Sequence, residues 1–293
     1  MDLVFFLPVM VGGVLAGASS ALLGVYIVGM RIPFLAVCVS HAALAGAVFG
    51  HLAGLDGSLM LWPALLAAMG TALLLGLLEG QHVRVDTNVI IGVLFSLSMG
   101  LAFLGIGLFG VLGKSDNEVR SLLWGSLLFC RWPDVALMAG VTAGLALFVL
   151  VFRKELRAIL FSRLHAAAAG VQVGLVWTGF LILTSAALTV NFQTVGGLMI
   201  YSLITNPALA AFQLARGHDR VLWLAILLGG LTSLVGFLAA AHWDLPVGAT
   251  IVILSSLLVG AGWMIGRRQK HSPKRRWDTG SGQREWRKVQ SDK

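Results

Sequence analysis

Charged residues are scarce in this sequence. They form 12% of its 293 residues, whereas soluble domains carry about a quarter. A soluble monomer could not cover its surface with so few charges, and hydrophobic residues reach 58% with a mean hydropathy of +0.89. The composition therefore indicates an integral membrane protein and excludes a nucleic-acid-binding domain and a disordered chain. No nucleic-acid partner is expected.

Cysteine is also scarce, since the chain holds two. Cys38 and Cys130 lie far apart, each in or beside an apolar run. Two such residues do not make a disulfide framework, which excludes a small secreted scaffold held together by disulfides.

Motifs of nucleotide hydrolysis and of proteolysis are missing. The nearest approach to a phosphate-binding loop is Gly107-Leu-Phe-Gly-Val-Leu-Gly-Lys-Ser115, in which five residues instead of four separate Gly107 from Gly113. The segment also follows a predicted span and faces outward, away from cytoplasmic ATP. Neither Gly-x-Ser-x-Gly nor His-Glu-x-x-His occurs in the sequence. We therefore expect no enzyme activity from this chain and no permanently bound cofactor.

Long apolar runs follow one another along most of the chain. Each can cross a hydrocarbon core of about 30 Å at about 1.5 Å per residue. The sequence therefore predicts an all-α polytopic membrane helical bundle with eight or nine transmembrane helices, in a transmembrane domain of residues 1–266. The predicted spans are 3–30, 34–54, 59–79, 89–112, 132–152, 171–190, 196–214, 221–240 and 246–266.

The net charge of +8 belongs almost entirely to residues 267–293, which hold ten Lys/Arg and three acids. Together with the connections between spans, one side of the membrane carries eighteen Lys/Arg and the other side three. This split predicts an outer N-terminus and a cytoplasmic C-terminus. Residues 267–293 show no apolar periodicity, so we expect a disordered basic cytoplasmic tail that is attracted to anionic membrane lipid.

The largest predicted inner connection, residues 153–170, has the pattern of a short amphipathic helix. Its cations alternate with apolar residues at helical spacing, and Gly170 can end the helix. Such a helix either anchors in the membrane interface or docks a cytoplasmic partner.

Two other stretches do not fit simple spans. Residues 121–130 are apolar but too short to cross, which favours a re-entrant or interfacial segment. Residues 191–197 put polar side chains and two glycines between apolar runs. Either a backbone break held against protein or a turn at the outer surface fits this pattern.

His41 is an ionisable residue inside the second predicted span, where such residues are costly. Cys38 lies three residues earlier on the same helical face, so the thiol and the imidazole could bind a soft metal ion, or both could be packing residues. A metal-binding imidazole needs an acceptor for its second nitrogen, which we expect from another span. His51 and Asp244 lie near the outer ends of their spans and are further candidates.

Five segments, in a fixed order along the chain, carry a family resemblance. They are Ser40-His-Ala-Ala-Leu-Ala-Gly46, Asp86 with Ile91-Gly92 and Phe95-Ser96, Leu123-Trp-Gly-Ser-Leu-Leu128, Val195-Gly-Gly-Leu-Met-Ile-Tyr-Ser-Leu-Ile-Thr-Asn-Pro-Ala-Leu-Ala-Ala211, and Trp243-Asp-Leu-Pro-Val-Gly-Ala-Thr-Ile-Val-Ile253. Through them, most of residues 10–260 resemble the membrane-spanning permease of bacterial ABC importers for zinc, manganese or iron.

The resemblance implies a permease subunit that imports a divalent metal ion across the bacterial cytoplasmic membrane. A separate cytoplasmic ABC ATPase would dock on residues 153–170, and the residues expected to contact it are Arg157, Ser162, Arg163, Leu164 and His165. An extracytoplasmic metal-binding protein would deliver the ion, and a second permease copy would complete a homodimer with the metal path between the copies. His41 is the motif histidine of that path, with Cys38, His51 and Asp244 as further candidate ligands.

Two positions depart from the family pattern. Family members carry an Asp four residues before the motif histidine, where this chain has Val37. A hard manganese ion prefers carboxylate oxygen, so Val37 favours zinc, with manganese or iron as alternatives. The inner loop reads Phe161-Ser-Arg-Leu-His-Ala166 without the usual acidic residues, which indicates a divergent ATPase partner. The alternative functions are a permease for a metal chelate such as a siderophore or haem, and a regulatory membrane protein without transport.

Overall fold

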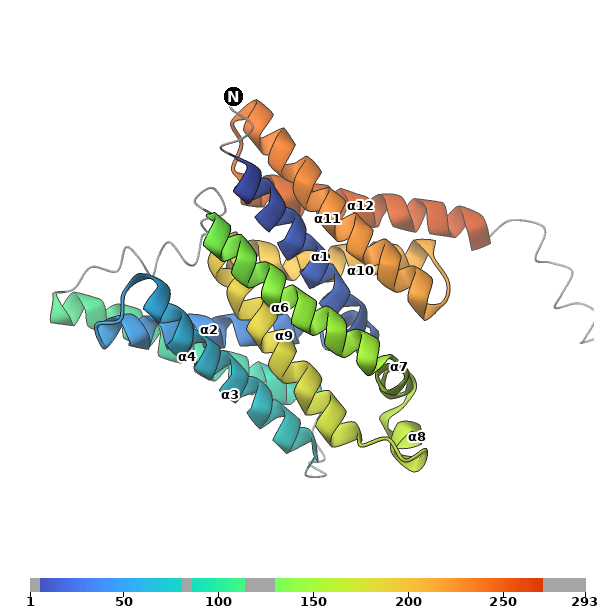
Figure 1. The fold of residues 1–293 in the computed structure, drawn as a ribbon, viewed down its shortest axis with the longest axis horizontal. Coiled ribbons are helices and arrows are strands. Elements are labelled where there is room, and N and C mark those ends of the chain that lie inside the picture. The colour runs from blue at the N-terminus through green and yellow to red at the C-terminus, as the bar shows by residue number, and fades with distance from the viewer. Residues whose placement is uncertain (1–5, 81–85, 114–129, 271–293) are drawn as a thin grey trace, which may run out of the picture.

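The computed structural model describes residues 6–80, 86–113 and 130–270, and in these ranges every regular element is helical. Eight helices there are long and apolar enough to cross a membrane, and α10 is a further long helix. The prediction of an all-α polytopic membrane bundle is confirmed (Figure 1). The elements are α1 (Leu7–Gly29), α2 (Phe34–Leu52), η1 (Gly57–Met60), α3 (Leu61–Gly80), α4 (Thr87–Leu112), α6 (Trp132–Val151), α7 (Arg153–Phe161), α8 (Arg163–Ala168), α9 (Val173–Val195), α10 (Gly197–Leu214), α11 (His218–Trp243) and α12 (Val247–Lys270).

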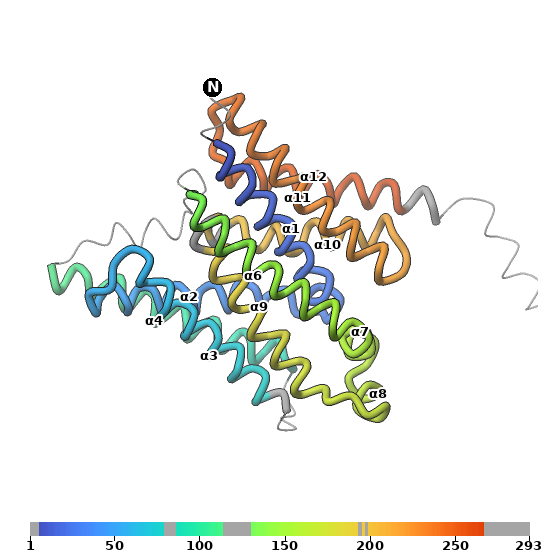
Figure 2. Tube along the Cα trace, viewed as in Figure 1, coloured from blue at the N-terminus to red at the C-terminus, as the bar shows by residue number. Residues whose placement is uncertain are grey.

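The helices pack in two groups. α1 runs beside α11 and also packs on α10, which in turn packs on α12; α2 packs on α3 and α4, and α9 packs on α3 and α6 (Figure 2). We refer to α1, α10, α11 and α12 as the C-terminal group, and to α2, α3, α4, α6 and α9 as the central group.

Glycines bring the helices of the C-terminal group into backbone contact. A Cβ added at Gly17 would collide with the carbonyl oxygen of Gly229 on α11, and one at Gly24 would collide with the carbonyl oxygen of Ile204 on α10. Such close approach of small residues is how helices associate in a bilayer, where water does not drive them together. The three helices therefore form one tightly packed unit.

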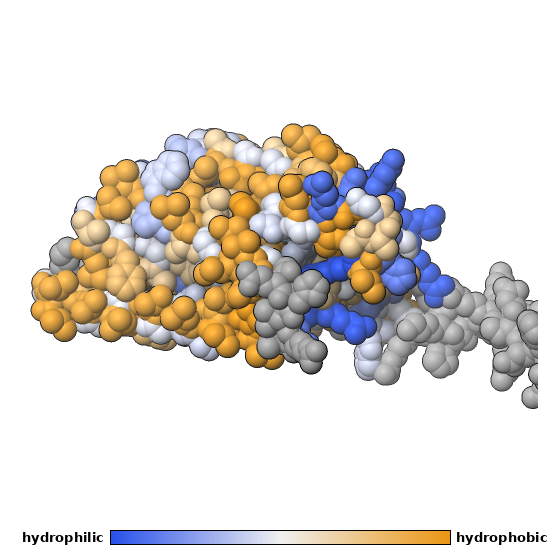
Figure 3. Space-filling model, turned by 90° about the horizontal axis from the view of Figure 1, so that it is seen from below, coloured by the Kyte–Doolittle hydropathy of each residue, from blue (hydrophilic) through white to orange (hydrophobic). Residues whose placement is uncertain are grey.

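The outer surface is apolar around the bundle. Large side chains such as Leu66, Phe103, Leu147 and Trp223 are more than half exposed. In Figure 3 hydrophobic residues cover most of the face, and hydrophilic ones gather toward the end where α7, α8 and the α10–α11 connection lie. This distribution fits a lipid-facing belt with a polar cap at one end.

The stretch at 191–197 is a one-residue break between two helices. α9 continues through Asn191 to Val195, Gly196 takes φ +92°, and α10 begins at Gly197. Gly196 is buried, and the Asn191 side chain donates to the hydroxyls of Ser19 (2.9 Å) and Ser20 (3.3 Å) on α1. Of the two interpretations, the structure supports a backbone break held against protein.

The inner connection is two helices instead of the single helix predicted for 153–170. Ser162 is extended (φ −167°, ψ 120°) and separates α7 from α8. Its hydroxyl accepts the backbone N–H of His165, so Ser162 is the N-cap that starts α8. The single-helix prediction was wrong because alternation of cations and apolar residues does not reveal a capping serine. Gly170, at φ +85°, follows α8 as expected.

Two predicted segments fall wholly or partly outside the described residues. The proposed re-entrant stretch at 121–130 lies outside except for Cys130, and the tail lies outside from residue 271 onward. α12 continues to Lys270, past the predicted boundary at residue 266.

Candidate metal path and ATPase-docking surface

His41 sits in the middle of α2 with its ring fixed by the backbone of its own helix. Its Nδ1 lies 2.9 Å from the carbonyl oxygen of Val37. A carbonyl can only accept, so Nδ1 donates to it, and Nε2 is the ring nitrogen left for another partner. The expected acceptor from another span was wrong, because the carbonyl one turn earlier on α2 already takes that role.

The side chains of α2 divide sharply between the core and one narrow stripe. Most of the helix is buried, and the residues with appreciable exposure include Phe34, Val37, His41 and Phe49, which recur at helical spacing. We call this set the α2 stripe. The stripe carries much of the exposed surface of α2, although Phe34 and His41 on it also contact Phe95 of α4.

Phe95 of α4 positions the His41 ring. Its ring lies 5.1 Å from that of His41 in an edge contact and 4.9 Å from that of Phe34. Aromatic rings at such distances prefer edge-to-face contact, which favours the observed orientation of the imidazole. Phe95 belonged to one of the sequence segments quoted above, but it was not predicted as a site residue.

Cys38 is only 1% exposed and belongs to the main hydrophobic cluster of the bundle, with Val39 and Leu35. His41 instead lies half-buried on the α2 stripe. Cys38 is therefore placed as a packing residue would be, and its proposed role as a ligand has no structural support beyond helical spacing.

His51 interacts with nearby residues, and Asp244 lies at the exposed end of α11. His51 Nδ1 lies 2.7 Å from Asp56 Oδ1, and its ring packs on Phe109 at 5.2 Å. Asp244 is exposed and ends α11 in the left-handed conformation, at φ 50°. Among the described residues, no three His, Cys, Asp or Glu side chains gather as a site for a metal ion. The structure does not bring the four predicted ligands together.

Gly46, which ends the Ser-His-Ala segment, has a packing role. A Cβ there would collide with the carbonyl oxygen of Pro63 on α3 and lie 2.8 Å from the Cβ of Ala67. Gly46 thus lets α2 approach the backbone of α3, and this close approach helps to fix the position of His41 on the same helix.

The α7–α8 pair presents apolar side chains to the outside. Leu156 and Ile159 of α7 and Ala166 of α8 are buried, while Phe161 and Leu164 are 86% and 79% exposed. These two flank Ser162, whose hydroxyl lies 2.9 Å from His165 Nδ1. We call Phe161, Ser162, Leu164 and His165 the docking surface. Phe161 was not among the predicted contact residues, but its exposure puts it on the same surface as Leu164.

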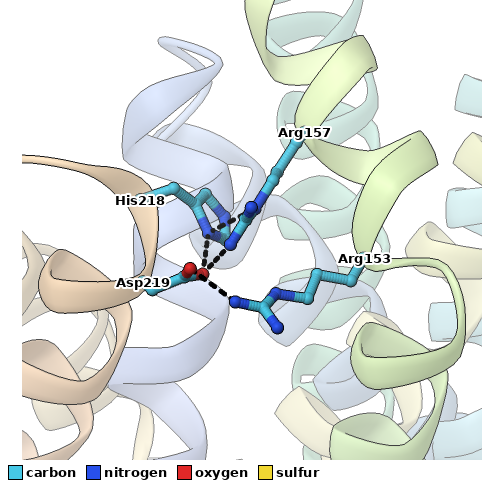
Figure 4. A network of polar contacts seen from close by, with 4 residues as sticks. All are labelled: Arg153, Arg157, His218 and Asp219. Carbon is cyan, nitrogen blue, oxygen red and sulfur yellow. Dashed lines mark hydrogen bonds and ion pairs between the residues drawn. The ribbon is translucent and has the colours of Figure 1, made fainter.

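The predicted docking cations face the bundle. Arg157 pairs with Asp219 of α11 (Figure 4), and the guanidinium carbon of Arg163 lies 4.5 Å from the ring centroid of Trp177 on α9. A guanidinium at this distance over an indole is attracted by the ring face. Both side chains therefore hold α7 and α8 in place, while direct contact with an ATPase stays a prediction.

Comparisons with known proteins agree on one family. The sequence model of the ABC 3 transport family matches residues 2–265. The chain is 25% identical over 253 residues to the chelated iron transport system membrane protein YfeD of Yersinia pestis, covering 86% of this chain and 82% of that protein. It is 24% identical over 256 residues to the manganese transport system membrane protein MntC of Halalkalibacterium halodurans, covering 87% and 85%.

Among solved structures, the fold matches PsaBC from Streptococcus pneumoniae in complex with Fab. The TM-score is 0.76 at 22% sequence identity, covering 93% of this chain and 94% of that chain. At this identity the match shows a shared fold.

Proposed function

Because this chain belongs to the ABC 3 transport family of metal-transporter permeases, we propose that it imports a divalent metal ion and that His41 is a ligand on the ion's path. The observation that carries the proposal is the geometry of His41. Its Nδ1 donates to the Val37 carbonyl oxygen, which leaves Nε2 as the nitrogen that would bind the metal ion. An imidazole on the α2 stripe would be costly against lipid, and a metal path beside it offsets that cost.

Zinc is our first choice of cargo, with manganese and iron as alternatives. Position 37 on the α2 stripe is a valine, so the path offers no carboxylate there. Imidazole suits zinc, whereas manganese prefers carboxylate and water oxygens. The relatives named for manganese and for chelated iron keep the alternatives open.

The proposed partners follow from the same family membership. A cytoplasmic ABC ATPase would bind the docking surface and supply the ATP hydrolysis that this chain is expected to lack. An extracytoplasmic metal-binding protein would deliver the ion at the opposite end. A second copy of the permease would face the α2 stripe and contribute further ligands. This arrangement puts the N-terminus outside and the C-terminus in the cytoplasm of a bacterial cell.

Uptake measurements with radiolabelled ions test the proposal. Cells that lack the chain are compared with cells that carry it, and each is supplied with zinc, manganese or iron as free ions, and with iron as a chelate. We expect chain-dependent uptake of a free ion, with zinc preferred. Uptake of the chelate alone would favour the wider path of a chelate permease, and equal uptake of every form with and without the chain would refute a transport role.

A further inference from the structure

Three charged residues and a histidine join α7 to the start of α11. The Nη2 of Arg153 lies 2.5 Å from Oδ2 of Asp219, and the Nη2 of Arg157 pairs with Oδ1 of the same carboxylate. Arg157 Nε also donates to Nδ1 of His218 at 3.1 Å. Figure 4 shows the two arginines reaching from α7 toward Asp219 and His218. We call these contacts the Asp219 linkage.

The Asp219 linkage places opposite charges together at the N-terminal ends of α7 and α11. Arg153 and Arg157 are like charges one turn apart, and Arg153 stands at the positive N-terminal end of α7. Repulsion between the two arginines and a cation at the helix N-terminus both destabilise α7. Asp219 pairs with both cations, one oxygen to each, and its single negative charge offsets their mutual repulsion. It lies in the first turn of α11, where an acid is favourable.

Arg157 makes the linkage directional. It uses Nε for His218 and Nη2 for Asp219, two neighbouring residues of α11. A guanidinium offers such a fork of fixed donors, whereas an ammonium is a single point charge. Arg157 therefore fixes the position of α7 relative to the end of α11 as well as its charge.

The linkage adds a charged contact between α7 and α11 to the packing that already joins the two groups, in which α1 contacts α6 and α9. On its apolar side α7 inserts Leu156 and Ile159 into the main hydrophobic cluster and packs on α9 of the central group. On its charged side it holds α11, which belongs to the C-terminal group and touches α1 backbone to backbone at Gly229 and Gly17. α7 therefore contacts the central group through apolar side chains and α11 through the linkage.

We propose that Asp219 is a positioning residue for transport: it ties the ATPase-docking pair α7–α8 to α11, so that movement of the docking surface shifts the C-terminal group. This inference rests on the proposed function, because it requires an ATPase on the docking surface. The side chains of Arg153, Arg157 and Asp219 are 46%, 37% and 45% exposed, so water partly screens the pairs and they contribute little to folding. Their directional geometry serves transmission of movement.

The test compares transport with ATP hydrolysis in the complete transporter. The permease with its ATPase and metal-binding protein is placed in vesicles, and labelled zinc uptake is measured per ATP hydrolysed for Asp219→Asn. The matched control is Arg220→Gln, which removes the neighbouring exposed charge on α11. We expect Asp219→Asn to keep ATPase co-purification and hydrolysis while the uptake per ATP falls about tenfold, and the control to behave like the wild type.

Two further variants separate linkage from simple charge loss. Arg157→Lys keeps the charge but not the fork, so its uptake per ATP should also fall. The exchanged variant Asp219→Arg with Arg153→Asp and Arg157→Asp restores opposite charges and should recover part of the ratio. Recovery would not follow if Asp219 acted only through the local fold.

The contrary outcomes are distinct. A wild-type ratio in Asp219→Asn overturns the linkage, and so does loss of ATPase co-purification, which would make Asp219 part of the docking surface itself. If Asp219→Asn does not fold, Arg157→Lys and the exchanged variant decide the matter by the same ratio. If the wild-type transporter takes up no metal in any form, the proposed function fails first.

Discussion

Replacing Gly46 tests how closely α2 packs on α3, because the effect of a larger side chain there can be estimated from the structure. In Gly46→Ala the new Cβ would collide with the Pro63 carbonyl oxygen and lie 2.8 Å from the Cβ of Ala67. A backbone oxygen cannot rotate away, so α2 and α3 must separate. Overpacking of this kind costs about 1–3 kcal/mol, and it moves His41, one and a half turns away on the same helix.

The matched control is Gly92→Ala on α4. Gly92 is also a helical glycine of a predicted motif, but an added Cβ there has nothing within 4 Å. We therefore expect this variant to keep the stability and the transport activity of the wild type.

Thermal unfolding in detergent measures the difference, together with labelled metal uptake. Each kcal/mol lowers the midpoint of a chain this long by about 2–4 °C, so Gly46→Ala should unfold several degrees below Gly92→Ala and take up less metal. Equal midpoints for the two variants would refute the claim that Gly46 is required for close packing of α2 on α3.

Three other predictions concern separate parts of the chain. Asn191→Ala removes the buried hydrogen bonds to the two serines of α1, and the thermal midpoint should show a loss of about 1 kcal/mol; an unchanged midpoint would mean that the pair adds nothing. Phe161→Ala with Leu164→Ala should weaken ATPase co-purification without changing the midpoint, since both side chains are exposed, and undiminished co-purification would contradict the docking surface. Burial raises the pKa of Cys130 to about 11, so its thiol is protonated at neutral pH. Cys130 should then react with maleimide far more slowly than a free cysteine, and the reaction should become faster as the pH rises toward 11. Rapid labelling of Cys130 at pH 7 in a Cys38→Ser background would contradict this prediction.

The long helices were predictable because hydropathy and helix-ending signals act locally. The run predicted at 89–112 is α4, Thr87–Leu112, whose ends are marked by the capping Asp86 and by Gly113 in the left-handed conformation. The side chain of Asp86 accepts the N–H of Asn88, as an N-cap does. Such signals need no knowledge of neighbouring helices.

Contacts between side chains of different helices could not be predicted from the sequence. Arg157 looked like a solvent-facing docking residue, since its pattern on α7 does not reveal that the start of α11 passes beside it. The pairing with Asp219 depends on how the α10–α11 connection folds back, and hydropathy carries no information on that. The sequence therefore did not reveal that Arg157 pairs within the bundle, or that Phe161 is exposed, and contact of Arg157 with an ATPase stays a prediction.

The role of His41 could be predicted from the sequence only in part. Its position inside a span singled it out, but its acceptor was expected from another helix. A histidine in a helix can reach the carbonyl four residues earlier only in one ring orientation, and here Phe95 from α4 helps to select that orientation. Contacts of this kind emerge only when the helices are placed against each other.

The most direct test of the account is uptake of labelled zinc by His41→Ala, measured with the complete transporter in vesicles and compared with Ser40→Ala. Ser40 is the adjacent residue, but its side chain is buried at 1% exposure, whereas His41 lies on the α2 stripe. We expect that His41→Ala loses uptake while it still inserts and binds the ATPase, and that Ser40→Ala transports normally. Full transport by His41→Ala would contradict the claim that this imidazole lies on the metal path.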